Sequence, residues 1–332
     1  QFFSWPLLCA IINSTLQHGF ARKERGVKMD FLLAFMKSMP SSIAQGLIWG
    51  IMSLGVYITY KVLDYADLTV DGSLCTGGAV AAVLTVGGMN PLLALLFAFL
   101  AGMLTGLVTG VLHTCFGIPA ILSGILTQLA LYSINMRIMG KSNVPLSVDQ
   151  YPLTVSLRYV WPAVAVGVIA VAAVVAILYW FFGTEIGCAI RATGNNQAMA
   201  RAQGVNTNAM KVLGLVLSNG LVGLSGALYA QYQGSADINM GRGAIVIGLA
   251  SVIVGEVVFG ARFNFAYRLA SIAGGSIIYF IVIAFVLQCG MPTQDLKLFS
   301  ALTVAVFLAL PYLRGKYFKK GISKKKGGKA DA

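Results

Sequence analysis

Long apolar stretches separated by short polar segments run through most of this chain. They are near 20 residues long and lack a sustained alternation of apolar and polar positions, a pattern typical of membrane-spanning helices. Pro91, Pro119 and Pro162 lie near expected helix starts, where proline costs least. We therefore predict an all-α, polytopic helical membrane protein with about eight to nine transmembrane helices. The apolar segments are 43–63, 73–88, 91–112, 118–138, 160–182, 209–233, 243–260, 264–288 and 297–313.

The composition agrees with this class. Hydrophobic residues make up 58% of the chain and charged residues 11%, against about 25% charged residues in soluble domains. The mean hydropathy is +0.80. The five cysteines lie far apart without a C-x-x-C pair, so the sequence predicts neither a metal site nor a disulfide framework, and no cofactor.

Small residues recur at helical spacing in two apolar segments. Gly102, Gly106 and Gly110 follow one another every four residues, and Gly46 and Gly50 repeat the spacing. Residues four apart share one helix face, where glycine lets two backbones approach closely. We expect these faces to pack inside the bundle, with a subunit interface as the alternative.

Positive charge is concentrated at the C-terminal end. Lys+Arg 24 and Asp+Glu 11 give a net charge of +13, and residues 314–332 form a basic tail. The positive-inside rule places this tail in the cytoplasm, where it can rest on anionic membrane lipid. Nucleic-acid binding is disfavoured because no folded soluble domain accompanies the lysines.

Counting back from the tail places the arginine-bearing segments 183–207 and 261–268 in the cytoplasm as well. Nine crossings put the N-terminus outside, which Lys28 and Lys37 oppose, so the parity stays open. The same count places the loop 137–158 outside. This loop is either a connector or part of the surface that receives a substrate-delivery protein.

The domain boundaries follow from these patterns. Met29 precedes the first long apolar helix, whereas residues 1–28 carry their charges after a short apolar run, opposite to a signal peptide. We expect 1–28 to be a non-native or over-extended segment. We expect residues 29–313 to form the transmembrane domain, with a partner-docking segment at 183–208, and 314–332 to form the tail.

The polar segment 183–204 has the signals of a short helix between two spans. Asn195 or Asn196 can cap its N-terminus, Gly204 can end it in the left-handed conformation, and Thr207 can cap the next helix. A helix of about two turns is unstable alone in water. The segment is therefore typical of a docking element.

Three carboxylates, Asp64, Asp67 and Asp71, lie between the first two apolar segments with almost no loop. The Thr, Val and Gly-Ser around them predict a broken helix near residues 64–73. Broken helices at membrane depth face protein or a water-filled path, although an interfacial turn with solvated carboxylates is the alternative. Candidate path residues are Asp64, Asp67, Asp71, Ser73, Gln128, Asn219 and Glu256.

Glu256 has a competing interpretation, because Arg262 and Arg268 follow it and favour an interfacial ion pair. Catalytic signatures such as H-E-x-x-H and G-x-S-x-G do not occur. The tripeptide 140–142 imitates the end of a phosphate-binding loop, but Asn135 stands where the loop needs its first glycine. An energised transporter would therefore need a separate ATPase.

The stretches Asp67–Ser73 and Gly187–Val205 together resemble the permease subunits of bacterial ABC importers for branched-chain amino acids, ribose and related sugars. The resemblance covers about residues 43–313. Residues Gly248–Glu256 are most similar to the tryptophan/tyrosine-type subgroup. Asp71 is an insertion relative to the sugar permeases, and a chain starting at Met29 lacks their additional first helix.

The resemblance implies a core of two permeases and two ATPases in the bacterial inner membrane, fed by an extracytoplasmic substrate-binding lipoprotein. The second permease is expected to be another copy of this chain. The short cytoplasmic helix then docks on the ATPase and transmits its closure. The implied ATPase-coupling residues are Gly187, Arg191, Thr193, Gly194, Asn196, Ala200, Arg201 and Gly204.

We therefore predict a permease subunit that moves a small solute such as an amino acid, aromatic amino acids included. The alternative is an ion-coupled secondary transporter that uses the intramembrane carboxylates. A membrane enzyme is disfavoured, because no catalytic constellation is present. Specificity in such importers resides largely in the binding protein, so the sequence does not name the solute.

Overall fold

The computed structural model describes residues 27–151, 153–260 and 264–288, together with 298, 301–306 and 309. The basic tail, nearly all of the expected N-terminal segment 1–28 and most of the ninth apolar segment lie outside the described residues. So does Arg262.

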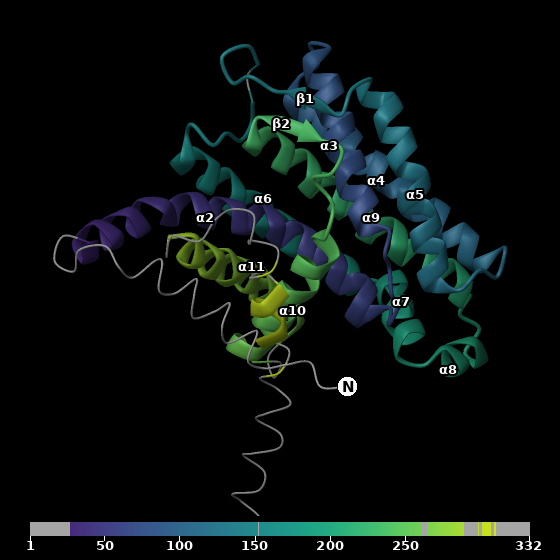
Figure 1. Ribbon diagram of the computed structural model, residues 1–332. Helices are drawn as coiled ribbons and strands as arrows, with labels where there is room; N and C mark the ends of the chain where they lie inside the picture. Colours follow the sequence, from purple (N-terminus) through teal and green to yellow (C-terminus); the bar gives the residue numbers. More distant parts are fainter. Residues whose placement is uncertain are drawn as a thin grey trace, which may run out of the picture.

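Helices dominate the described chain (Figure 1). Eight of the nine predicted apolar segments coincide with helices, and five helices among the described residues are long and apolar enough to cross a membrane. The prediction of an all-α polytopic membrane protein is confirmed. The helices are α2 (Val27–Tyr57), which continues into the π-helix η1 (Ile58–Val62), α3 (Val70–Val86), α4 (Pro91–Thr114), α5 (Ala120–Met139), α6 (Val160–Phe182), α7 (Glu185–Asn195), α8 (Gln197–Ala202), α9 (Thr207–Gln233), α10 (Ala244–Phe259) and α11 (Phe265–Gln288).

Glycine faces hold the centre of the bundle together. A Cβ added at Gly102 or Gly106 of α4 would overlap backbone carbonyl groups of α9, and one at Gly46 of α2 would lie 2.7 Å from Cα of Ile277 in α11. These backbones approach too closely for any side chain. The expectation that the glycine repeats pack helices inside the bundle is therefore met at these positions.

A two-stranded antiparallel ribbon closes one end of the bundle. Strand β1 (Asn143–Pro145) pairs with β2 (Ser235–Asp237), with Val144 opposite Ala236. The sequence pattern predicted neither strand of this ribbon. Strand β1 lies inside the loop 137–158, and β2 follows directly after α9. Figure 1 shows the ribbon at one end of the molecule and α7 and α8 at the other.

Two helices, α3 and α10, are shorter than the spans around them, at 17 and 16 residues. The backbones at their N-terminal ends touch, because a Cβ added at Gly241 would overlap the carbonyl oxygen of Asp71. Both helices therefore begin at one place inside the bundle. The non-helical segment before α3 is the break that the sequence predicted near residues 64–73.

Candidate functional site

The break between η1 and α3 separates the three carboxylates that the sequence places together. Asp64 has φ +51°, a conformation that few residues other than glycine adopt, and its side chain is exposed. Asp67 is buried at 3% exposure, and Asp71 lies in the first turn of α3. The three side chains do not share one helix face, because the helix is interrupted before and after Asp67.

Asp67 is held by two donors in the interior. One carboxylate oxygen accepts the backbone N–H of Thr69 at 2.9 Å, and the other accepts Nδ2 of Asn219 in α9 at 2.7 Å. Ser73 donates to Oδ1 of the same Asn219 at 2.6 Å. The predicted path residues Asp67, Ser73 and Asn219 therefore form one buried cluster that joins the break to the middle of α9.

Threonine hydroxyls extend this cluster onto two further helices. Thr105 of α4 lies 2.7 Å from Ser73 Oγ, and Thr109 lies 2.8 Å from Thr69 Oγ1 and donates to Thr127 of α5 at 3.0 Å. These threonines were missed by the sequence reasoning. The signal that could have found Thr105 and Thr109 is their spacing of four residues inside an apolar helix, on the glycine face.

Asp71, unlike Asp67, binds backbone groups at the start of another helix. Its carboxylate accepts the backbone N–H groups of Gly243 and Ile245 at 2.9 Å each, so it caps the N-terminus of α10 from another helix. Gln128 lies apart from the Asp67 cluster, in a cavity that Asp71 also lines. The cross-helix cap explains why a carboxylate stands at this position of α3.

Glu256, near the end of α10, forms an ion pair with Lys61 of η1 at 3.2 Å between Nζ and Oε2. The ion-pair interpretation is supported with Lys61 as a partner, whereas Arg262 lies outside the described residues. The pair ties α10 to the last turn before the break. Among the described residues, no group of three His, Cys, Asp or Glu side chains could hold a metal ion.

The segment 183–208 contains two helices rather than one. Thr184 caps α7 by accepting the N–H of Gly187, and Asn196 caps α8 by accepting the N–H of Met199 at 3.0 Å. Gly204 has φ +83° after the end of α8. The predicted cap at Asn196 and the predicted left-handed conformation of Gly204 are thus observed.

The cap of the next helix was predicted one residue too late. Asn206 caps α9 by accepting the N–H of Ala209 at 3.2 Å, and Thr207 instead accepts Nε of Arg201 at 2.8 Å. An Asn side chain is a stronger cap than Thr, and it lies at the position from which its oxygen reaches the first turn. Arg201 is therefore held by its own chain.

The two short helices have a buried face and an exposed face. Gly194 packs against the end of η1, where an added Cβ would overlap the carbonyl oxygen of Val62, and Gly187 packs against the end of α6. The inward side chains are Ile190, Thr193 and Ala200, each at most 2% exposed. Met199 is 59% exposed on the opposite side. Gly187, Thr193, Gly194 and Ala200 of the predicted coupling set thus contact their own chain.

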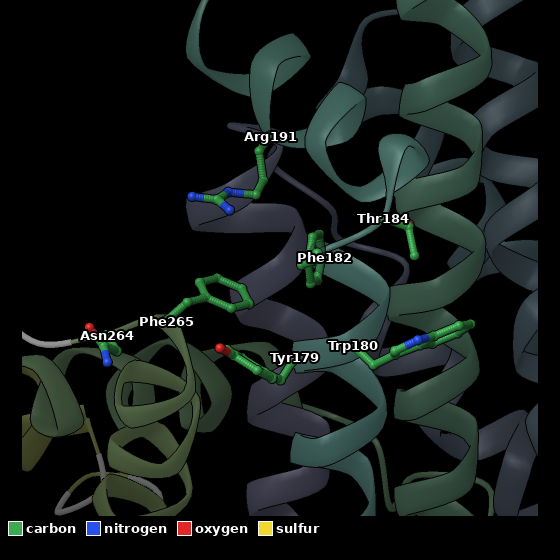
Figure 2. A pocket seen from close by; sticks show the side chains of 8 residues that line it. Tyr179, Trp180, Phe182, Thr184, Arg191, Asn264 and Phe265 are labelled. Atoms are coloured by element: carbon green, nitrogen blue, oxygen red, sulfur yellow. The ribbon is translucent and has the colours of Figure 1, made fainter.

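Arg191 lies over an aromatic ring beside a cavity of about 640 Å³ between α6, α7 and the start of α11. Its guanidinium carbon is 5.3 Å from the centre of the Phe265 ring, a cation–π distance. Figure 2 shows Arg191 beside Phe265, with Tyr179 below and Trp180 extending away from them. Arg191 is exposed, so its cation remains accessible from solvent.

The contact between α7 and η1 joins two predicted features that are far apart in the sequence. Besides Gly194 on Val62, Leu63 packs on Gly214 of α9, next to Ile190 of α7. A displacement of α7 would therefore press on the residues that begin the break. Nothing in the local pattern of either segment predicts this neighbourhood.

Comparison with known proteins identifies relatives of this chain. A family model described as branched-chain amino acid transport system / permease component matches residues 38–311. The chain is 42% identical over 281 residues to the tyrosine transport system permease protein of Clostridioides difficile, covering 82% of this chain and 91% of that protein. It is 30% identical over 188 residues to the nucleoside ABC transporter permease protein NupC of Lactococcus lactis, covering 51% and 58%. It is 26% identical over 212 residues to the ribose import permease protein RbsC of Escherichia coli, covering 62% and 64%.

Proposed function

Since this chain belongs to the family of permease components of branched-chain amino acid transport systems, we propose that it is the membrane subunit of an ATP-driven amino acid importer. The family membership confirms the resemblance carried by Asp67–Ser73 and Gly187–Val205. It also makes the chain a permease component of an ABC transport system and a multi-pass membrane protein. The proposal adds the solute class, the energy source and the partners.

The proposal that ATP hydrolysis by a partner subunit drives transport rests on the contact of α7 with η1. An ATPase that binds the exposed side of α7 and α8 would move a rigid element whose buried side abuts the break, through Gly194 and Val62. Packed backbones transmit such a displacement because they cannot be compressed. The ion-coupled alternative loses support, since Asp67 and Glu256 each have partners within the protein.

The exposed residues of α7 and α8 suit a partner surface. Met199 and Ile186 are 59% and 50% exposed on the two short helices that lie between the apolar spans α6 and α9. Ala198 and Ala202 are small and exposed, so a partner can approach the helix axis closely. We assign this face to the ATPase and place it, with the C-terminus, in the cytoplasm.

The solute class rests on the similarity to the tyrosine transport system permease protein, which spans most of both chains. We propose an amino acid, aromatic amino acids included. The ribbon end of the bundle then faces the extracytoplasmic binding lipoprotein, because α6 and α9 connect it to the α7–α8 end. A second copy of this chain, surrounded by membrane lipid, completes the permease pair.

The test is reconstitution with an ABC ATPase and a substrate-binding lipoprotein from the same organism. Proteoliposomes holding the complex are given ATP and labelled L-tyrosine, L-tryptophan or L-leucine with the binding protein outside. We expect uptake that requires ATP and is unaffected by proton or sodium ionophores. Uptake that persists without the ATPase and collapses with an ionophore would refute the proposal in favour of ion coupling.

A further inference from the structure

A second cavity lies where α3, α5 and the segment after β2 meet. Its volume is about 260 Å³, and it sits beside the shared starting point of α3 and α10, since Gly72 belongs to the first and Arg242 precedes the second. Its lining comprises Asp71, Gly72, Cys75, Gln128, Leu129, Tyr132, Asn135, Ile238 and Arg242. Short helices that begin inside a transporter are where solute sites are found.

Asn135 is the unusual residue of this cavity. Its side chain is 1% exposed, yet neither its amide nitrogen nor its amide oxygen makes a hydrogen bond to the residues that the structure describes. The Cys75 thiol lies beside it but donates to the carbonyl oxygen of Ile238 at 3.2 Å, and a thiol is in any case a weak partner. Leaving a buried amide unpaired costs free energy. The Asn135 side chain therefore offers an unused hydrogen-bond donor and an unused acceptor to a molecule in the cavity.

The charges around the cavity have both signs. Arg242 is exposed at its rim and forms no ion pair with the part of the chain that the structure describes. Asp71 brings a carboxylate, although two backbone N–H groups of α10 already bind it. Gln128 adds a second amide, and Leu129 and Tyr132 supply apolar surface. This set matches a small molecule that carries a carboxylate, an ammonium group and an apolar side chain.

We propose that this cavity is a transient binding site for an α-amino acid on its way through the protein. Arg242 attracts the carboxylate, and the oxygens of Asn135, Gln128 and Asp71 receive the ammonium group. Because the cavity adjoins the segment that follows β2, it lies toward the ribbon end, on the side from which the proposed binding protein delivers its solute. The proposal rests on the proposed function and specifies residues of the permease that recognise the solute.

Asn135→Leu tests the site in the reconstituted importer. Leucine fills a similar volume and removes the unpaired amide, so the midpoint of thermal unfolding should stay the same or rise. Uptake of labelled L-tyrosine should fall roughly tenfold, the usual effect of losing hydrogen bonds to a polar ligand. ATP hydrolysis stimulated by the binding protein should stay within about twofold of wild type. A purely structural role would not lower uptake while preserving stability.

Arg242→Gln is the second variant. Because Arg242 is exposed, we expect this substitution to leave the fold intact. We expect a similar loss of uptake, whereas the matched control Lys37→Gln, at an exposed position of α2, should transport normally. Normal uptake by both Arg242→Gln and Asn135→Leu in an importer whose wild type transports an amino acid would overturn the site and leave the proposed function intact. If Asn135→Leu unfolds below wild type, Arg242→Gln decides alone. A wild-type complex that transports no amino acid would overturn both proposals.

Discussion

Gly194 of α7 lies directly against Val62, the last residue of the π-helix η1. A Cβ at Gly194 would overlap the carbonyl oxygen of Val62 and would lie 2.8 Å from Cα of Leu63. Glycine is required there by this close approach of two backbones. The contact places the proposed ATPase-binding helices against the break in the transmembrane region.

Replacing Gly194 should therefore separate ATP hydrolysis from transport. We expect Gly194→Leu to displace α7 from η1, to cost about 1–3 kcal/mol of stability, and to reduce uptake more than ATPase activity. Both activities are measured on the same reconstituted complex. The matched control is Ala173→Leu, at an exposed position of α6 outside the proposed ATPase-binding face. Equal uptake per ATP in Gly194→Leu and wild type would contradict the proposed transmission.

The exposed side of α8 makes a second prediction. Met199→Asp places a charge on a 59% exposed apolar position, so binding of the ATPase should weaken roughly tenfold or more while the permease still inserts into the membrane. Co-purification of the ATPase with the tagged permease measures this effect. Gln150→Asp, in the loop beyond β1 at the other end, should bind the ATPase normally. Full retention of the ATPase by Met199→Asp would remove α8 from the interface.

Asn219 supports the buried carboxylate at the break. Asn219→Ala removes the donor to one oxygen of Asp67 and the acceptor for Ser73, so the midpoint of thermal unfolding in detergent should fall by the equivalent of about 1–3 kcal/mol or more. Asn208→Ala, at an exposed position of the same helix, should have little effect. An unchanged midpoint for Asn219→Ala would show that the cluster does not hold the break in place.

Asp71 should matter for stability through α10. Asp71→Ala leaves two N–H groups of that helix without their partner, and we expect a loss of about 0.5–2 kcal/mol, as for other helix caps. Asp71→Asn keeps an accepting oxygen and should recover part of this loss. Asp149→Ala breaks the exposed ion pair with Arg158 and should change stability little. A fully stable Asp71→Ala would contradict the capping role.

Local signals in the sequence were sufficient for the helices and for several of their ends. Apolar length gave the spans, the glycine spacing gave the packed faces, and Asn196 and Gly204 marked the ends of α8 because capping depends on neighbouring residues. Thr207 failed as a cap because Asn206 competes for the same N–H groups. The π-helix before the break carries no comparable local signal.

The partners of the polar residues could not be read from the sequence. Asp67 and Asn219 are 152 positions apart, and Glu256 meets Lys61 across two helices, so neither pair follows from spacing. The same limit hides the contact of Gly194 with Val62. Sequence patterns identify the polar and charged residues in apolar helices, whereas the fold decides which of these residues contact one another.

The ribbon of β1 and β2 has a mechanical consequence for α9. It fastens the last residues of that helix to the loop beyond α5. α9 is 27 residues long, so its other end, next to α8, lies roughly 40 Å away along the helix axis. Backbones of α3 and α4 pack directly on the glycine-rich middle of α9, so this helix is a rigid connection between the two ends of the bundle.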